Sequence, residues 1–184
     1  AIGFSALING VVAQLASSRR PPPPSQTVNY YGTVEARRII YGETRVGGME
    51  TLPPVTTGTN NQMLHQVLTI AGHEVNAISQ VWFNQEQVGT IGAVTGTTSD
   101  GLVSTGTFAN RAWVRRYLGT ASQTADYILD NALSIWTSDH RARGIAYAAI
   151  QFQYDDTKYK TGKPQVTFQV QGKKLYDPRK DSTN

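Results

Sequence analysis

The chain has 184 residues, no cysteine, and 17 lysine or arginine residues against 13 aspartate or glutamate residues. This length fits a single domain whose core forms without disulfides, and the lack of cysteine excludes both a disulfide framework and a thiolate metal site. Charged residues make up only 16% of the sequence, which favours strands and polar turns over long surface helices. We therefore expect a mainly β protein of the α+β kind, with one flanking helix and an N-terminal helical segment.

The charges are unevenly distributed along the chain. Residues 49–107 contain no lysine or arginine, and their only acidic side chains are Glu50, Glu74, Glu86 and Asp100. Neighbouring copies can meet through faces of opposite charge, although an ordinary solvated surface explains the pattern about as well. Nucleic-acid binding has weak support, because the sequence has no arginine-rich run, zinc-finger spacing or RNP-like aromatic motif.

Residues 1–18 form an apolar segment without charged side chains. Its apolar residues recur at helical spacing and share one face: Phe4, Leu7, Ile8, Val11, Val12 and Leu15. The run is too short for a comfortable membrane span, and the basic start of a signal peptide is missing. We expect this helix to dock on a partner. Residues 19–29, with four consecutive prolines, are expected to form a stiff linker.

Residues 30–180 form the predicted β-rich domain. Apolar alternation and turn residues predict strands at residues 36–41, 64–70, 75–83, 107–118, 144–154 and 165–170. The strand at 64–70 should be covered on both faces and the last strand half exposed. Residues 90–107, rich in glycine and threonine, should form a flexible loop or hairpin. A helix capped near Ser122 should follow, with a core-facing stripe of Ala125, Ile128, Leu129, Ala132, Leu133 and Trp136.

The strand at residues 107–118 has the most informative pattern, because one of its faces interleaves arginine with aromatic side chains. This combination is typical of protein interfaces, but it also suits stacking on bases or simple cross-strand packing. We favour a subunit contact. The predicted interface residues are Phe4, Leu7 and Val11 in the N-terminal helix and Arg111, Trp113, Arg115 and Tyr117 in this strand.

Few groups in the sequence suit catalysis. His65, His73 and His140 are isolated and lack the spacing of zinc ligands. The adjacent Asp155 and Asp156 are more typical of a hairpin tip than of a calcium or acid-base pair. We therefore predict that the chain is not an enzyme and has no catalytic residue, no metal site and no cofactor.

Four segments carry a family resemblance: residues 36–48 (ARRIIYGETRVGG), 64–88 (LHQVLTIAGHEVNAISQVWFNQEQV), 123–154 (with TADYILDNALSIWTSDHRARGIAYAAIQFQY) and 162–179 (GKPQVTFQVQGKKLYDPR). They resemble the hub region of the tip attachment (host-specificity) protein J family of tailed phages with long, flexible tails. The match runs in family order over most of residues 30–179. It does not extend to the fibronectin-like and receptor-binding parts of the longer family members.

The resemblance implies a tube-like β-barrel or sandwich hub domain, three copies of which build a ring that continues the tail tube. Our leading hypothesis is a structural hub of the distal tail tip of the virion, assembled in the host cytoplasm. This hub would join the tail tube to the tip complex and would surround the channel through which DNA leaves.

The resemblance implies that the chain binds other copies of itself to form a trimer. It also implies contacts with distal tail proteins, tail tube proteins and other tail tip proteins. DNA would pass without specific binding, and no membrane span is expected. The alternatives are a carbohydrate- or cell-wall-binding β module of the tail tip and a tail-associated hydrolase.

Overall fold

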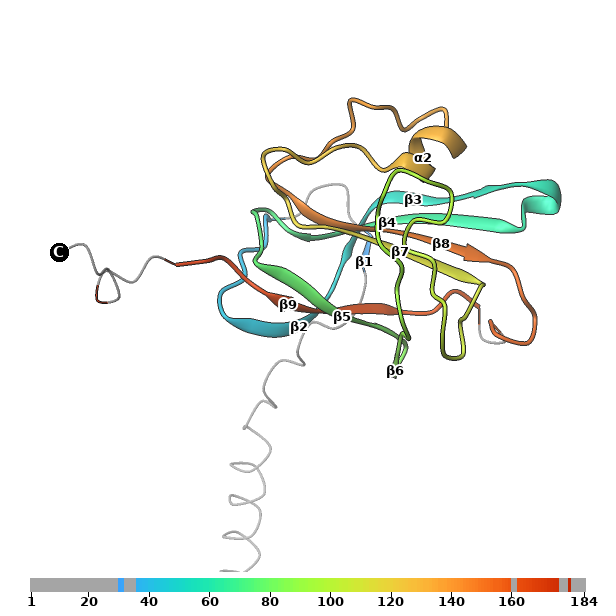
Figure 1. Ribbon diagram of the computed structural model, residues 1–184, viewed down its shortest axis with the longest axis horizontal. Helices are drawn as coiled ribbons and strands as arrows, with labels where there is room; N and C mark the ends of the chain where they lie inside the picture. The colour runs from blue at the N-terminus through green and yellow to red at the C-terminus, as the bar shows by residue number, and fades with distance from the viewer. Residues whose placement is uncertain (1–29, 32–35, 160–161, 176–178, 180–184) are drawn as a thin grey trace, which may run out of the picture.

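The computed structural model describes residues 30–31, 36–159, 162–175 and 179 (Figure 1). In this part of the chain, nine strands form a five-stranded sheet in the order β1-β3-β4-β8-β7 and a four-stranded sheet in the order β2-β9-β5-β6. The predictions for the N-terminal segment, including Phe4, Leu7 and Val11, lie outside the described residues.

The five-stranded sheet contains β1 (Tyr30–Tyr31), β3 (Met49–Thr57), β4 (Met63–Ala71), β8 (Ala146–Gln153) and β7 (Ala112–Tyr117). Neighbouring strands are antiparallel except β1 and β3, which run parallel. The central strands β4 and β8 consist mostly of buried residues, because other layers cover both of their faces. The prediction of a doubly covered strand at residues 64–70 is confirmed.

The four-stranded sheet contains β2 (Glu43–Gly47), β9 (Val166–Gln171), β5 (Ala77–Phe83) and β6 (Glu86–Gln87), all in antiparallel pairs. Strand β9 is more buried than its alternating pattern predicted. Its outward-facing Thr167 is only 2% exposed and accepts a hydrogen bond from Nε of Arg45 at 2.9 Å. The Arg45 guanidinium also lies 4.2 Å from the ring centroid of Trp82, and these two side chains cover the strand.

The two sheets pack face to face around one hydrophobic core. Ring contacts within this core join the sheets: Phe83 of β5 lies 5.2 Å from Phe152 of β8, edge to face. Aliphatic side chains from both sheets surround them, among them Leu68, Ile70, Val81, Val114, Ile150, Val166, Phe168 and Val170. Since the described residues form two separate sheets, the fold is the sandwich form of the prediction and not a closed barrel.

A helical layer covers the outer face of the five-stranded sheet (Figure 1). Helix α2 (Tyr127–Ala132) and the loop after it pack Leu129, Leu133 and Trp136 against Val67 and Tyr147. The predicted core-facing stripe is confirmed for the buried Ile128, Leu129 and Leu133, whereas Ala132 is exposed. The helix is shorter than expected, and it is capped by Asp126, whose carboxylate accepts from the backbone N–H of Leu129 at 2.8 Å, and not by Ser122.

Two segments differ from the predicted strands. Residues 36–41 are not a strand; the backbone N–H of Ile40 donates instead to Nε2 of His73 at 2.9 Å. Strand β3 was not predicted, because Pro53 and Pro54 lack the N–H that a strand interior needs. Near the edge of the sheet this loss is tolerated, since β1 pairs only with Met49 and Glu50.

Residues 90–107, expected to be flexible, are organised around the buried carboxylate of Asp100. It accepts hydrogen bonds from the backbone N–H groups of Thr95 and Gly96 at 2.9 and 2.8 Å and from the Thr97 hydroxyl at 3.0 Å. Burial alone would raise the pKa of Asp100, but these bonds lower it to about 2. A bridge between Leu102 and Trp113 attaches the loop to β7.

Candidate subunit-contact site

The predicted interface strand corresponds to β7, which begins at Ala112. Trp113, Arg115 and Tyr117 lie on its outer face, the face that the helical layer covers in part, and Arg111 immediately precedes the strand. The structure divides the predicted residues into two groups. Arg115 and Tyr117 are buried, whereas Arg111 and Trp113 are partly exposed.

Arg115 and Tyr117 are used within the fold. Nε of Arg115 lies 2.6 Å from Oδ2 of Asp126, and both side chains are completely shielded from solvent. The Tyr117 hydroxyl donates to the same carboxylate at 3.1 Å, and its ring stacks on Tyr147 with centroids 4.5 Å apart. The interface prediction for Arg115 and Tyr117 is therefore corrected: they attach the helical layer to the sheet.

Burial controls the electrostatics of this cluster. It raises the pKa of Tyr117 and Tyr147, and the neighbouring charge of Asp126 raises both further. In the same sheet, His65 of β4 has its pKa lowered to about 4, first by burial and then by the charge of Arg115. His65 is thus a neutral interior side chain, with its Nε2 2.7 Å from the Thr57 hydroxyl.

Arg111 connects β7 to the turn after β8. Its Nε lies 3.1 Å from Oδ2 of Asp155, and its Nη1 donates to Oε1 of Gln153 at 3.2 Å. The Thr157 hydroxyl and then Arg111 lower the pKa of Asp155 to about 2. Because β8 and β9 belong to different sheets, this turn starts a crossing between sheets and is not a hairpin tip. Arg111 and Trp113 stay predicted contact residues.

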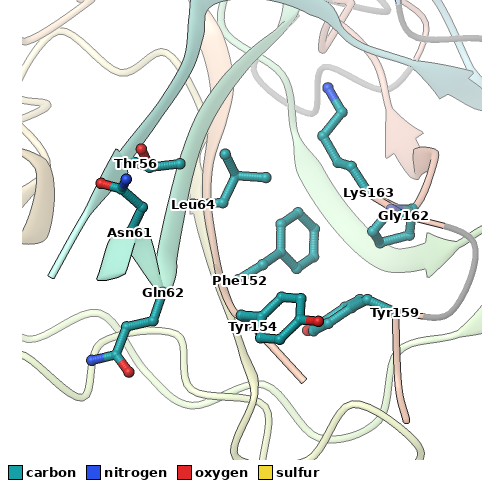
Figure 2. A pocket seen from close by; sticks show the side chains of 10 residues that line it. Thr56, Asn61, Gln62, Leu64, Phe152, Tyr154, Tyr159, Gly162 and Lys163 are labelled. Carbon is teal, nitrogen blue, oxygen red and sulfur yellow. The ribbon is translucent and has the colours of Figure 1, made fainter. Parts of the chain in front are cut away.

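A groove that the sequence patterns did not reveal opens at one end of the core, next to Arg111. Its cavity of about 240 Å³ is lined by Thr56, Asn61, Gln62, Leu64, Phe152, Tyr154, Tyr159, Gly162, Lys163 and Pro164. Figure 2 shows Leu64 and Phe152 directed into the space between the β3–β4 hairpin and Tyr159. The hairpin extends beyond the four-stranded sheet here (Figure 1), and Phe152 at the base of the groove is only 4% exposed.

Two polar groups at this groove are already bonded within the chain. The Tyr159 hydroxyl donates to the backbone oxygen of Arg111 at 2.8 Å, and the Lys163 ammonium pairs with Glu50. Tyr154, by contrast, is 72% exposed at the mouth. The groove therefore presents mainly carbon, and the sequence signal that could have found it is the pair of tyrosines flanking the Asp155 turn.

The acidic side chains of residues 49–107 have different environments. Asp100 is buried in its loop, and Glu50 pairs with Lys163 and accepts from Nε2 of Gln66 at 3.3 Å. Glu74 and Glu86 are exposed. Contact with a neighbour's basic residues stays a prediction that the exposed Glu74 and Glu86 fit best, although Glu86 also accepts a hydrogen bond from the Thr107 hydroxyl.

The three histidines have separate partners in different parts of the fold. His73 contacts the backbone of Ile40, His65 contacts Thr57, and the His140 ring stacks on Trp136 with centroids 5.2 Å apart. No three histidine, aspartate or glutamate side chains of the described residues lie close enough together to hold a metal ion. Across the same residues, no helix has the length and apolarity of a membrane span.

No family model and no curated protein matches the chain. It is similar to a chain in a solved structure of the virion of a native gene transfer agent particle, with 16% sequence identity and a TM-score of 0.49. The match covers 92% of this chain and 38% of that chain, so this chain spans about two fifths of the other's length. A likeness at this level carries no argument about function.

Proposed function

We propose that the chain is a virion structural protein, namely a hub component of the distal tail tip of a phage that acts through protein–protein assembly. In this role it joins the tail tube to the tip complex and surrounds the DNA-exit channel. The proposal includes the absence of catalysis.

The main support for this proposal is that the four segments resembling the tip attachment family pack together in one body. They contribute every strand of the four-stranded sheet and the central strands β4 and β8 of the other sheet. The resemblance therefore covers one packed body and not a set of scattered loops. A compact sandwich of this kind suits a repeated unit in a ring.

The edge strand β2 offers a means of assembly. Among the described residues it pairs on one side only, with β9, and Glu43 and Thr44 are exposed. Unpaired strand edges bind other strands readily, and repeated head-to-tail contacts between copies close into rings. This edge supports a role in assembly over a role as an isolated module.

The mass of the purified chain in solution, measured by analytical ultracentrifugation and native mass spectrometry, tests the proposal. We expect a concentration-dependent trimer. A chain that stays monomeric at every concentration would remove the hub role.

The exposed ring of Tyr154 favours a carbohydrate- or cell-wall-binding module as the second candidate, since sugars stack on exposed aromatic side chains. The Tyr159 hydroxyl and the Lys163 ammonium count against it, because they already bind groups of their own chain and sugar hydroxyls need free partners. Binding of soluble cell-wall fragments, lost in Tyr154→Ala while the oligomer is unchanged, would support this second candidate.

A further inference from the structure

The groove beside Tyr154 has the size of a side-chain pocket. Its volume of about 240 Å³ lies below the ~300–1,000 Å³ typical of small-molecule sites. The floor, formed by Leu64 and Phe152, continues into the hydrophobic core. Such a groove fits one or two apolar side chains projecting from a partner.

The mainly apolar lining of the groove indicates an apolar occupant. Leu64 and Phe152 form its floor, and the Tyr159 hydroxyl and the Lys163 ammonium already bind groups of their own chain. Amphipathic helices dock in such grooves with side chains spaced i, i+3, i+4 and i+7. Within residues 4–15, this chain has one stripe with that spacing and no charge on it: Phe4, Leu7, Ile8, Val11 and Leu15.

The direction of β1 indicates which copy supplies this stripe. Tyr30 pairs with Met49 and Tyr31 with Glu50 in parallel, so β1 runs toward the hairpin tip, as β3 does. Tyr30 therefore lies beside the end of β3 that is far from the groove. Thr56 at the groove lies seven residues beyond Met49, about 23 Å along the strand.

For the stripe to bind the groove of its own chain, the chain would have to reverse its direction between the stripe and Tyr30. The four prolines at residues 21–24 oppose it, because polyproline extends by about 3.1 Å per residue and bends poorly. A stiff linker of this composition favours a groove on a neighbouring copy as the receiver.

We propose that the groove binds the apolar stripe of residues 4–15 from a second copy of the chain. This contact deepens the proposed hub function and rests on it, since it needs an assembly. Each copy gives its stripe to one neighbour and accepts the stripe of another, which is the heterologous contact that closes a ring.

The absence of cysteine makes a cross-linking test direct. Leu7→Cys and Tyr154→Cys are placed together in the full chain, and a short bismaleimide is added. We expect cross-links between copies, seen as dimers and a ladder ending at the size of the ring. Mixing the two single variants should give one cross-linked dimer. Gln80→Cys, exposed on the outer face of the other sheet, replaces Tyr154→Cys as the control and should give none.

The outcomes separate the docking contact from the hub function. A trimer without cross-links would overturn the docking proposal and leave the hub role intact. A cross-linked monomer would show that the stripe binds its own groove and would overturn the choice of a second copy. A chain that is monomeric in solution and forms no cross-link between copies would overturn both. Competition by cell-wall fragments, with no cross-link, would assign the groove to a sugar.

A second pair of variants tests the apolar nature of the contact. Leu7→Asp in a Val11→Cys background, combined with Tyr154→Cys, should lower the cross-linking yield at least ten-fold, because a buried leucine contributes about 1.5–3 kcal/mol. Leu7→Ile, which keeps the apolar volume, should retain the yield. Equal yields for the two variants would contradict the proposal.

Discussion

Arg115 and Asp126 form an ion pair with Nε and Oδ2 2.6 Å apart, and neither side chain is exposed. Because Asp126 also caps α2, the pair fastens the helical layer to β7. A buried charge depends on its partner, since one left alone in the interior is poorly solvated. Arg115 therefore serves the fold, whereas Arg111, which pairs with Asp155 just before the strand, stays partly exposed.

Asp126→Asn should reduce the free energy of unfolding by about 3 kcal/mol, because Arg115 would stay buried without a counter-charge. Asparagine still caps a helix, so the loss reports mainly the ion pair. Urea unfolding followed by circular dichroism measures it. Asp130→Asn, on the exposed side of the same helix, should change stability by less than about 0.5 kcal/mol. Equal effects of the two substitutions would contradict this account.

The stability of the fold should fall between pH 7 and pH 5. The pKa of His65 drops from 6.5 to about 4 on folding, so the unfolded chain binds a proton in this range and the folded chain does not. The contribution is complete above pH 6.5 and is lost as the pH falls toward 4, by about 2 kcal/mol at pH 5. Urea midpoints at both pH values measure it. His65→Gln should flatten the dependence, and His140→Gln should keep it; a flat wild-type profile would refute the prediction.

The strands with a regular apolar pattern were predictable from the sequence. Strands β4, β5 and β8 were found because their period of two is strong and their ends carry turn residues. Strand β3 was not found because it contains Pro53 and Pro54. Proline is rare inside strands and is tolerated mainly where the strand lies near the edge of a sheet. Residues 36–41 have β-forming side chains, but tertiary hydrogen bonds such as that from Ile40 to His73 override this preference.

The candidate site was predictable only in part. The interleaved arginine and aromatic residues of β7 gave no sign of which ones a second layer would cover, because that depends on where α2 packs. Asp126, three residues before Leu129, was a local capping signal that could have been recognised. The groove beside Tyr154 joins residues from β3, β4, β8 and the crossing to β9, and no local pattern contains that convergence.

Gly101→Ala should destabilise the fold more than Gly96→Ala. Both glycines have positive φ, +69° and +88°, which a side chain disfavours by about 1–2 kcal/mol. A Cβ at Gly101 would also lie 2.3 Å from the backbone oxygen of Val114, whereas at Gly96 it would meet nothing within 4 Å. Thermal unfolding should show a loss of about 3 kcal/mol or more for Gly101→Ala and about 1 kcal/mol for Gly96→Ala. Equal losses would mean that the loop does not pack closely on β7.

Trp113 is the aromatic residue of β7 that remains partly exposed, so it is the best candidate for the main contact of the subunit boundary. Trp113→Ala should weaken self-association by about 2 kcal/mol, or about 30-fold in dissociation constant, because aromatic side chains at interface centres contribute most of the binding energy. Sedimentation equilibrium measures this constant. Trp82→Ala is the matched control, since Trp82 is equally a half-buried strand residue but lies on the outer face of the other sheet, under Arg45. If Trp82→Ala weakens association more than Trp113→Ala does, the boundary lies on the outer face of the four-stranded sheet and not at Trp113.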